Sequence, residues 1–209
     1  FDKPLLIMHN NTEGTVSYTN LLCIPSSKPF DLFNPDRKSS LKLYINRVFI
    51  TDKCDNLIPA YLRFVKGIVD TQDIDLNVSR EMLQNNPAVA KISKSLVGKI
   101  LRELKKIADK DKAKYIQFWN EFGQVLKEGL YEDLERKDTL LELARFSNNE
   151  NDDLISLEDY VNAMDKNQKD IYYIAADTKS QALSSPHLEG FKSKGIKVLV
   201  MADPIDQFW

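Results

Sequence analysis

The chain has 209 residues and a mass of 24.0 kDa, a size that suits one large domain or two small ones. Hydrophobic residues make up 43% and charged residues 29%, and no stretch holds the roughly 20 consecutive apolar residues that span a bilayer, so we expect a globular protein and no membrane segment. The 29 basic and 31 acidic residues nearly balance, which argues against a dedicated nucleic-acid binder.

The first third of the chain has the pattern of β-strands. Short apolar runs predict strands over residues 5–9 and 16–25, separated by a turn over 10–14. Residues 41–51, LKLYINRVFIT, form the clearest strand because they are rich in β-branched and aromatic side chains. Their apolar positions change face midway, so we expect a bulge or burial on both faces near Arg47.

Helices are predicted from the middle of the chain onward. Residues 56–70 place apolar side chains at helical spacing, with Gly67 as the stop. Asn86, a good N-cap, and Pro87, a good first helical residue, begin the strongest helix, and residues 113–146 are also helical in period. The apolar stripe of the strongest helix consists of Val89, Ile92, Leu96, Val97, Ile100, Leu101, Leu104 and Ile107.

The last third begins at a polar break over residues 147–153, the best candidate for a domain boundary. A short helix over 156–164 and a strand over 170–176 follow, and then a helical region over 178–193 and a strand over 197–203. This β-α-β order implies a parallel pair of strands with a right-handed crossover.

The predicted fold class is therefore α/β, in three parts. We expect a larger α/β unit over residues 1–110, a helical connector over 111–146 and a smaller α/β unit over 147–209. No all-α or all-β arrangement explains the pattern as well.

The sequence offers few groups for metal or nucleotide chemistry. Cys23 and Cys54 lack CxxC spacing and read as reduced, partly buried thiols. His9 and His187 lie far apart and fit no zinc or triad pattern, so we expect no metal site. The glycines form neither a GxGxxG nor a Walker loop, so no nucleotide-cradling loop is expected in this chain.

One segment, LNVSREMLQNN at residues 76–86, has the features of an anion site. Ser79 is a good helix cap, so Arg80 becomes the first helical residue, where its charge opposes the helix dipole. Gln84 lies four residues later and therefore on the same face. Guanidinium and amide donors at a helix start suit a phosphate, although Arg80 could instead pair with Glu81 or Asp75 at the surface. Because no nucleotide loop is present, a role on a nucleotide requires Arg80 to reach into the site of another domain.

Long ordered motifs resemble the middle domain of the heat shock protein 90 family of ATP-dependent chaperones. These motifs are LKLYINRVFITD, LIPAYLRFVKGIVDTQDIDLNVSREMLQ, EFGQVLKEGLYED, SLEDYVNAMDKNQKDIYYI and VLVMADPIDQF, and the match runs from PFDLF to the end of the chain. The resemblance implies a larger α-β-α sandwich that carries a catalytic loop, then a helical connector, and then a smaller α-β-α unit.

The resemblance also assigns roles to residues of this chain. It implies that Arg80 reaches the terminal phosphate of ATP in the closed dimer and that Gln84 supports this geometry. Asn77 and Ser79 belong to the same loop as supporting residues. It places Phe49 near an apolar patch for client proteins and for docking of the N-terminal domain, although an ordinary core role for Phe49 stays open.

The function expected from the resemblance is that of a chaperone middle domain acting in the stress response and in protein folding, where it binds unfolded proteins. ATP with magnesium is expected in an N-terminal ATPase domain outside this chain, so the full-length parent is an ATPase and this chain alone binds and hydrolyses no ATP. The expected partners are that domain, client proteins, co-chaperones and a second parent chain that dimerises through a C-terminal domain outside this chain. We expect no nucleic-acid or membrane partner and a cytoplasmic location. The alternative is a protein-interaction module with no catalytic contribution.

Overall fold

The computed structural model describes residues 3–34, 40–52, 54, 56–77 and 79–208. The chain divides into two compact units, Phe1–Leu126 and Lys127–Trp209, whose boundary falls inside the long helix α3, Lys112–Glu132. Mixed helices and two sheets confirm the predicted α/β class, while the division into three parts stays a prediction.

The larger unit is built on a five-stranded sheet with the order β1-β2-β5-β3-β4. Its strands are β1 Leu6–Thr12, β2 Tyr18–Ile24, β3 Ser40–Ile45, β4 Val48–Thr51 and β5 Lys66–Thr71. The helical elements of this unit are η1 Ala60–Leu62, α1 Arg80–Gln84, α2 Pro87–Lys110 and the first part of α3. β3 and β5 are parallel and the other neighbouring strands are antiparallel.

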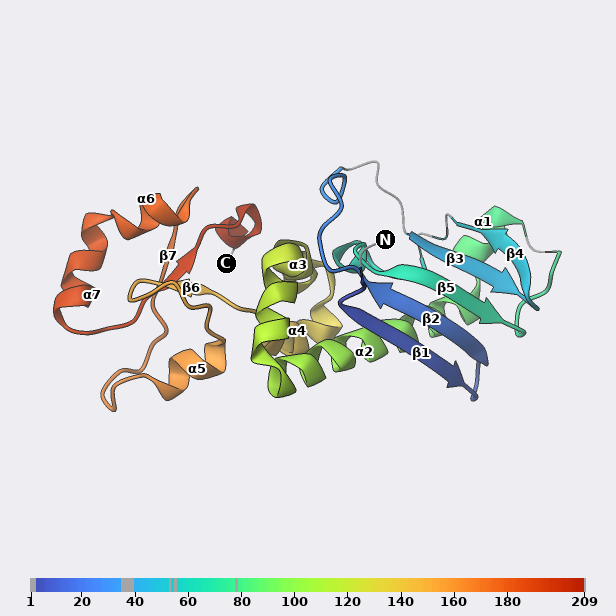
Figure 1. Cartoon of the computed structure of the whole chain (residues 1–209), viewed down its shortest axis with the longest axis horizontal. Coiled ribbons are helices and arrows are strands. Elements are labelled where there is room, and N and C mark those ends of the chain that lie inside the picture. The colour runs from blue at the N-terminus through green and yellow to red at the C-terminus, as the bar shows by residue number, and fades with distance from the viewer. Residues whose placement is uncertain (1–2, 35–39, 53, 55, 78, 209) are drawn as a thin grey trace. The chain divides into compact units, whose positions relative to one another are not determined.

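Helix α2 covers one face of this sheet, as Figure 1 shows. Its N-cap is Asn86, whose side chain accepts a hydrogen bond from the Ala88 N–H at 2.8 Å. All eight predicted stripe positions of α2 are buried. The apolar strand side chains that are buried in this core are Met8, Tyr18, Leu22, Ile24, Leu41, Leu43, Ile45 and Val69. The amphipathic pattern of α2 therefore predicted its packing face correctly.

Residues 41–51 form a hairpin and not the single strand that the sequence predicted. Asn46 and Arg47 have φ angles of 49° and 66° and connect β3 to β4. Two consecutive residues with positive φ make the type of tight turn whose twist matches a hairpin. The change of face in the apolar pattern therefore marks a reversal of the chain. The register of β3 and β4 also shifts between Leu43 and Tyr44, where the pairing passes from Thr51 to Phe49 and skips Ile50, so the irregularity expected near Arg47 is present in this hairpin.

Residues 56–70 are not the helix that their spacing predicted. Only η1 is helical there, and β5 begins at Lys66. Gly67 lies inside β5 with a φ of 146°, and a Cβ atom on it would lie 2.2 Å from the Leu21 carbonyl oxygen. Gly67 is thus required by the close approach of β5 to β2 and does not end a helix. The turn expected over 10–14 also begins later, because β1 continues to Thr12.

The smaller unit contains a three-stranded sheet with the order β6-β8-β7. Its strands are β6 Ser147–Asn148, β7 Tyr173–Ala175 and β8 Leu199–Met201. Its helical elements after α3 are η2 Leu134–Arg136, α4 Lys137–Leu143, α5 Leu157–Asn162, α6 Lys179–Leu183, η3 Pro186–Leu188, α7 Glu189–Ser193 and η4 Pro204–Phe208. β7 and β8 are parallel, which confirms the strand pairing expected from the β-α-β order. Within the described residues, no helix is both long enough and apolar enough to cross a bilayer.

Candidate functional site

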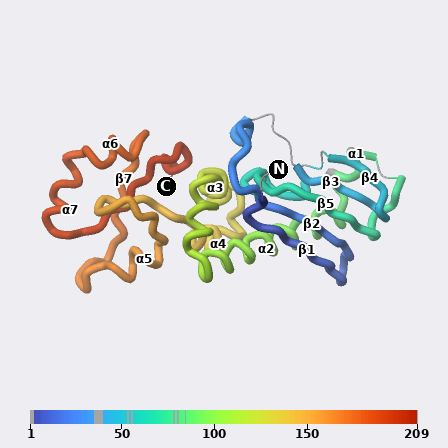
Figure 2. Tube along the Cα trace, viewed as in Figure 1, coloured from blue at the N-terminus to red at the C-terminus, as the bar shows by residue number. Residues whose placement is uncertain are grey.

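The segment 76–86 folds locally as the sequence predicted. Ser79 has an extended backbone, with φ −72° and ψ 159°, and its Oγ accepts a hydrogen bond from the Met82 N–H at 3.3 Å. Arg80 is therefore the first residue of α1 and Gln84 the last, four positions later. The side chains of Arg80 and Gln84 lie outside the described part of the chain, so the structure defines these two residues by their backbone. Figure 2 traces the chain from β5 through this segment to α2.

Two buried apolar residues hold the ends of this segment. Ile74 is 4% exposed and Leu83 is 2% exposed. The described residues between them are all exposed, namely Asp75, Leu76, Asn77, Ser79, Glu81 and Met82. A stretch with few buried contacts between two anchors opens more easily than the core around it. The described residues of this segment are thus held by few buried contacts between Ile74 and Leu83.

Phe49 lies on β4 and not on this segment. Its side chain is 50% exposed and makes an edge-on contact with Tyr44, with ring centroids 5.6 Å apart. Its neighbour Val48 is 51% exposed. Phe49 is therefore no ordinary core residue, and its exposure suits a contact with a partner. Its assignment to client or interdomain contact stays a prediction.

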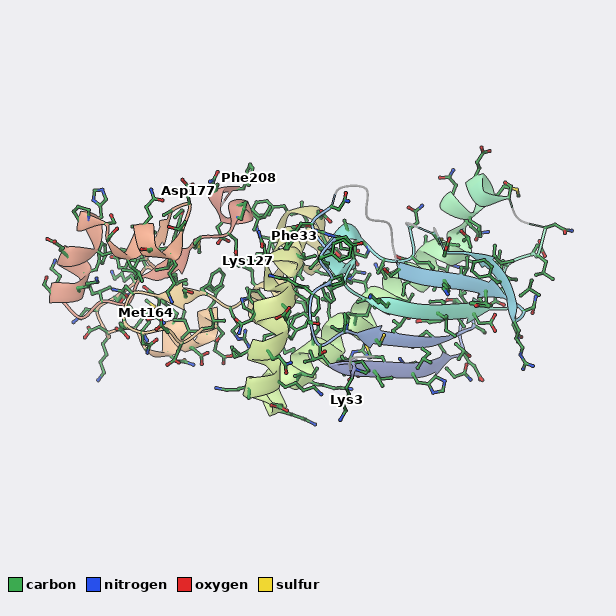
Figure 3. The ribbon with its side chains drawn as sticks, turned by 45° about the horizontal axis from the view of Figure 1, so that its top comes forward. Lys3, Phe33, Lys127, Met164, Asp177 and Phe208 are labelled. Carbon is green, nitrogen blue, oxygen red and sulfur yellow. The ribbon has the colours of Figure 1, made fainter. Side chains whose placement is uncertain are left out.

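Sequence reasoning missed a buried ion cluster in the smaller unit. Lys127 is 4% exposed, and its Nζ lies 2.7 Å from an Asp203 oxygen and 2.9 Å and 3.0 Å from the two Asp206 oxygens. The same Nζ lies 4.9 Å from the centroid of the Phe146 ring. Figure 3 labels Lys127 on α3. Burial raises the pKa of the nearby Tyr131 phenol, and the Asp206 carboxylate raises it further. The cluster connects α3 to η4 and therefore stabilises the smaller unit.

The smaller unit also has an open pocket of about 550 Å³. Its lining includes Tyr160, whose hydroxyl donates to the Lys197 carbonyl oxygen at 2.7 Å and accepts from the Gln168 amide and from the Tyr172 N–H, each at 3.0 Å. The Tyr160 hydroxyl is therefore fully engaged in hydrogen bonds that hold this part of the smaller unit together.

No cluster of three or more His, Cys, Asp or Glu side chains suited to a metal occurs in the described part of the chain. Cys23 and Cys54 form no disulfide. The candidate chemistry of the larger unit therefore rests on α1 and the residues that position it.

Comparisons with known proteins agree over the whole chain. A sequence model of the family described as Hsp90 protein matches residues 1–209. The chain is 56% identical to the chaperone protein HtpG of Paramagnetospirillum magneticum and 53% identical to that of Roseobacter denitrificans, each over 100% of this chain and 34% of the relative. The chain thus spans about a third of the length of these curated relatives.

A solved structure is similar as well. The middle domain of a putative heat shock protein of Plasmodium falciparum superposes with a TM-score of 0.83 at 35% identity, covering 100% of this chain and 81% of that one. The chain therefore belongs to the Hsp90 family. Within that family it corresponds to the middle domain, as the motifs from PFDLF to the end predicted.

Proposed function

We propose that this chain is the middle domain of an ATP-dependent chaperone and supplies Arg80 to the terminal phosphate of ATP. The observation that carries this proposal is the capped helix α1, which begins at Arg80 on an exposed segment between two buried anchors. Identity above 50% to HtpG chaperones over the full chain supports the same reading.

The part that this chain plays in the chemistry follows from its residue types. ATP with magnesium is held by an N-terminal domain outside the chain and supplies the phosphoryl group that is transferred to water. Arg80 brings a fixed cation with a planar fork of donors that matches phosphate oxygens, and such a group stabilises the charge of the transition state. Gln84, one turn later on the same helix face, contributes amide groups that orient Arg80 or the phosphate. Asn77 and Ser79 support the loop, Ser79 through the cap on Met82.

The local energetics suit a group that must move. Arg80 at the first helical position is disfavoured by the helix dipole, by a few tenths of a kcal/mol in an exposed setting. A helix of five residues is also too short to be stable on its own propensity. An anion arriving at α1 removes the mismatch, so the nucleotide site itself favours the working position of Arg80.

The chain is also proposed to contact other proteins and other domains of its parent. Phe49, half-exposed on β4, contacts client proteins or the docked N-terminal domain. The parent chain works in the cytoplasm as a homodimer, joined through a C-terminal domain outside this chain, with co-chaperones as further partners.

The test is ATP turnover by the full-length parent carrying Arg80→Ala. Loss of one phosphate contact in a site without bulk water is expected to remove about 2.7–4 kcal/mol of transition-state stabilisation, which is roughly a 10²–10³-fold fall in kcat. The matched control is Arg102→Ala, which removes an exposed arginine on α2. Turnover by Arg80→Ala at the wild-type rate would favour the alternative, a protein-interaction module that contributes nothing to catalysis.

A further inference from the structure

The end of β5 holds the chain where it leaves the sheet towards α1. Thr71 is buried, with 1% of its surface exposed. Its hydroxyl donates a hydrogen bond to the Ser17 carbonyl oxygen at 2.8 Å. The same hydroxyl accepts a hydrogen bond from the Asp73 N–H at 3.3 Å. Thr71 therefore connects the residues that follow β5 to the turn between β1 and β2 through hydrogen bonds.

Asp73 completes this connection from the other side. Its carboxylate accepts a hydrogen bond from the Ser17 N–H. Ser17, Thr71 and Asp73 thus form a closed ring of three hydrogen bonds, which we name the β5 latch. A ring of bonds restrains a backbone more than any one of them does, because all must break before the segment shifts.

The strand that carries the latch is itself held from its other side. The Thr71 carbonyl oxygen accepts from the Asn46 N–H at 3.0 Å, and the Asp70 carboxylate accepts from the Arg47 N–H at 3.1 Å. In the sheet register, Thr71 pairs with Tyr18 of β2 and with Ile45 of β3. The end of β5, which carries the latch, is therefore held by hydrogen bonds from both neighbouring strands of the sheet.

The latch lies where the chain leaves β5 towards α1, so it affects the path of the residues that lead to Arg80. Ile74, the first buried anchor, comes directly after Asp73, and the described residues between Ile74 and Leu83 are exposed. The direction in which this stretch leaves the sheet is set at residues 71–74. Because a misplacement of about 1 Å can cost a reacting group roughly 10²-fold in rate, control of that direction matters for a side chain that must meet a phosphate.

We propose that Thr71 and Asp73 are positioning residues for Arg80, which act by fixing the pivot about which the segment 75–82 swings. This proposal rests on the proposed role of Arg80. Both residues act through the backbone that they hold, so their loss is expected to change how often Arg80 reaches its working geometry and to leave the binding of ATP intact.

The experiment uses the full-length parent with Thr71→Val, which keeps the shape of the side chain and removes its hydroxyl. Thr71→Ser restores the hydroxyl and is the rescue variant, and Asp73→Ala removes the other half of the latch. The matched control is Thr19→Val, which removes an exposed hydroxyl whose bond to Asn11 lies outside the latch. Each variant is measured for kcat, for KM of ATP and for amide hydrogen exchange over residues 75–82 and over α2.

We expect Thr71→Val and Asp73→Ala to lower kcat at least about fivefold with KM unchanged within about twofold, and to speed exchange over residues 75–82 but not over α2. Thr71→Ser and Thr19→Val are expected to stay near wild type.

Wild-type kcat in Thr71→Val, an effect confined to KM, or faster exchange throughout α2 would overturn the positioning role. If Arg80→Ala lowers kcat in the same assay, the proposed function survives that result. If Arg80→Ala also leaves kcat unchanged, the proposed function has failed and the positioning role fails with it.

Discussion

Ser79 and Arg80 stand where loop becomes helix, and they act on the first turn of α1 in opposite ways. The Ser79 hydroxyl accepts a hydrogen bond from the Met82 N–H, whereas the helix dipole disfavours a cation at the first helical position, which Arg80 occupies. These effects are local, so the sequence predicted the cap and the helix start correctly. The role of Arg80 depends on a nucleotide outside the chain, so no local pattern could establish it.

The residue scale also shows which pairings a sequence cannot reveal. Lys127 is 76 residues from Asp203 and 79 from Asp206, and no pattern in the chain marks them as partners. The one local sign is that Lys127 directly follows the buried residues Val125 and Leu126 on α3. Long-range ion pairs of this kind depend on the completed fold.

Asp152 provides a test of surface electrostatics at single-residue scale. Its carboxylate accepts a hydrogen bond from Lys179 Nζ at 2.8 Å, and this bond, with the charge of Lys179, holds the pKa of Asp152 below its ordinary value. A depressed folded pKa stabilises the fold above the unfolded pKa, and this contribution is lost as the pH falls through the folded pKa. We expect Lys179→Met to return the pKa of Asp152 to the ordinary range in a carboxyl NMR titration. An unchanged titration curve would show that the pair does not persist in solution.

At the scale of elements, the errors of prediction came from tertiary context. Residues 41–51 read as one strand because both arms of the hairpin are rich in strand-forming residues, and the turn at Asn46 and Arg47 lacks the glycine that usually marks such turns. Residues 56–70 read as a helix because a 3₁₀ turn also gathers apolar side chains. Leu57, Tyr61, Phe64 and Val65 are all fully buried, but around η1 and the start of β5. By contrast, α2 was predicted well because 24 residues of regular periodicity leave little ambiguity.

Gly67 tests whether the close packing of β5 on β2 is as tight as described. Gly67→Ala would place a Cβ atom 2.2 Å from the Leu21 carbonyl oxygen and 2.8 Å from the Leu22 Cα, at a φ of 146°. We expect a loss of more than about 2 kcal/mol in the free energy of unfolding. The measurement is denaturant unfolding followed by circular dichroism.

The matched control for Gly67 is Gly98→Ala in α2, where the new methyl group meets nothing within 4 Å. Because alanine favours helix over glycine, this variant is expected to gain about 0.5–1 kcal/mol. Equal effects of the two substitutions would contradict the described packing of β5.

At the scale of the whole chain, the features described above are distributed between two compact units. The larger unit contains α1, the β5 latch and the β3–β4 hairpin that carries Phe49. The smaller unit contains the ion cluster of Lys127 and the open pocket. The α/β class and the parallel pairing of β7 with β8 were predicted from the sequence, whereas β6 was not. The unit boundary inside α3 has no local mark, because the helix continues through it without a break.

The ion cluster predicts a stability effect confined to the smaller unit. Lys127→Met leaves the Asp206 carboxylate, which is 1% exposed, without its partner, and the expected cost is about 3–5 kcal/mol. Hydrogen exchange should therefore quicken in β8 and α4 while α2 keeps its protection. The double variant Lys127→Met with Asp206→Leu is expected to recover much of the loss, since it leaves no unpaired charge at that position. Unchanged exchange in β8 after Lys127→Met would show that the cluster does not stabilise the unit.

The most direct test of the central claim separates the chemical step from nucleotide binding in the full-length parent. ATP is bound at saturation and its hydrolysis is followed in a single turnover for wild type, Arg80→Ala and Arg80→Lys. We expect Arg80→Ala to slow hydrolysis roughly 10²–10³-fold with an unchanged Kd for ATP, and Arg80→Lys to recover only part of the rate because a lysine lacks the planar fork. Hydrolysis of bound ATP by Arg80→Ala at the wild-type rate would contradict the account.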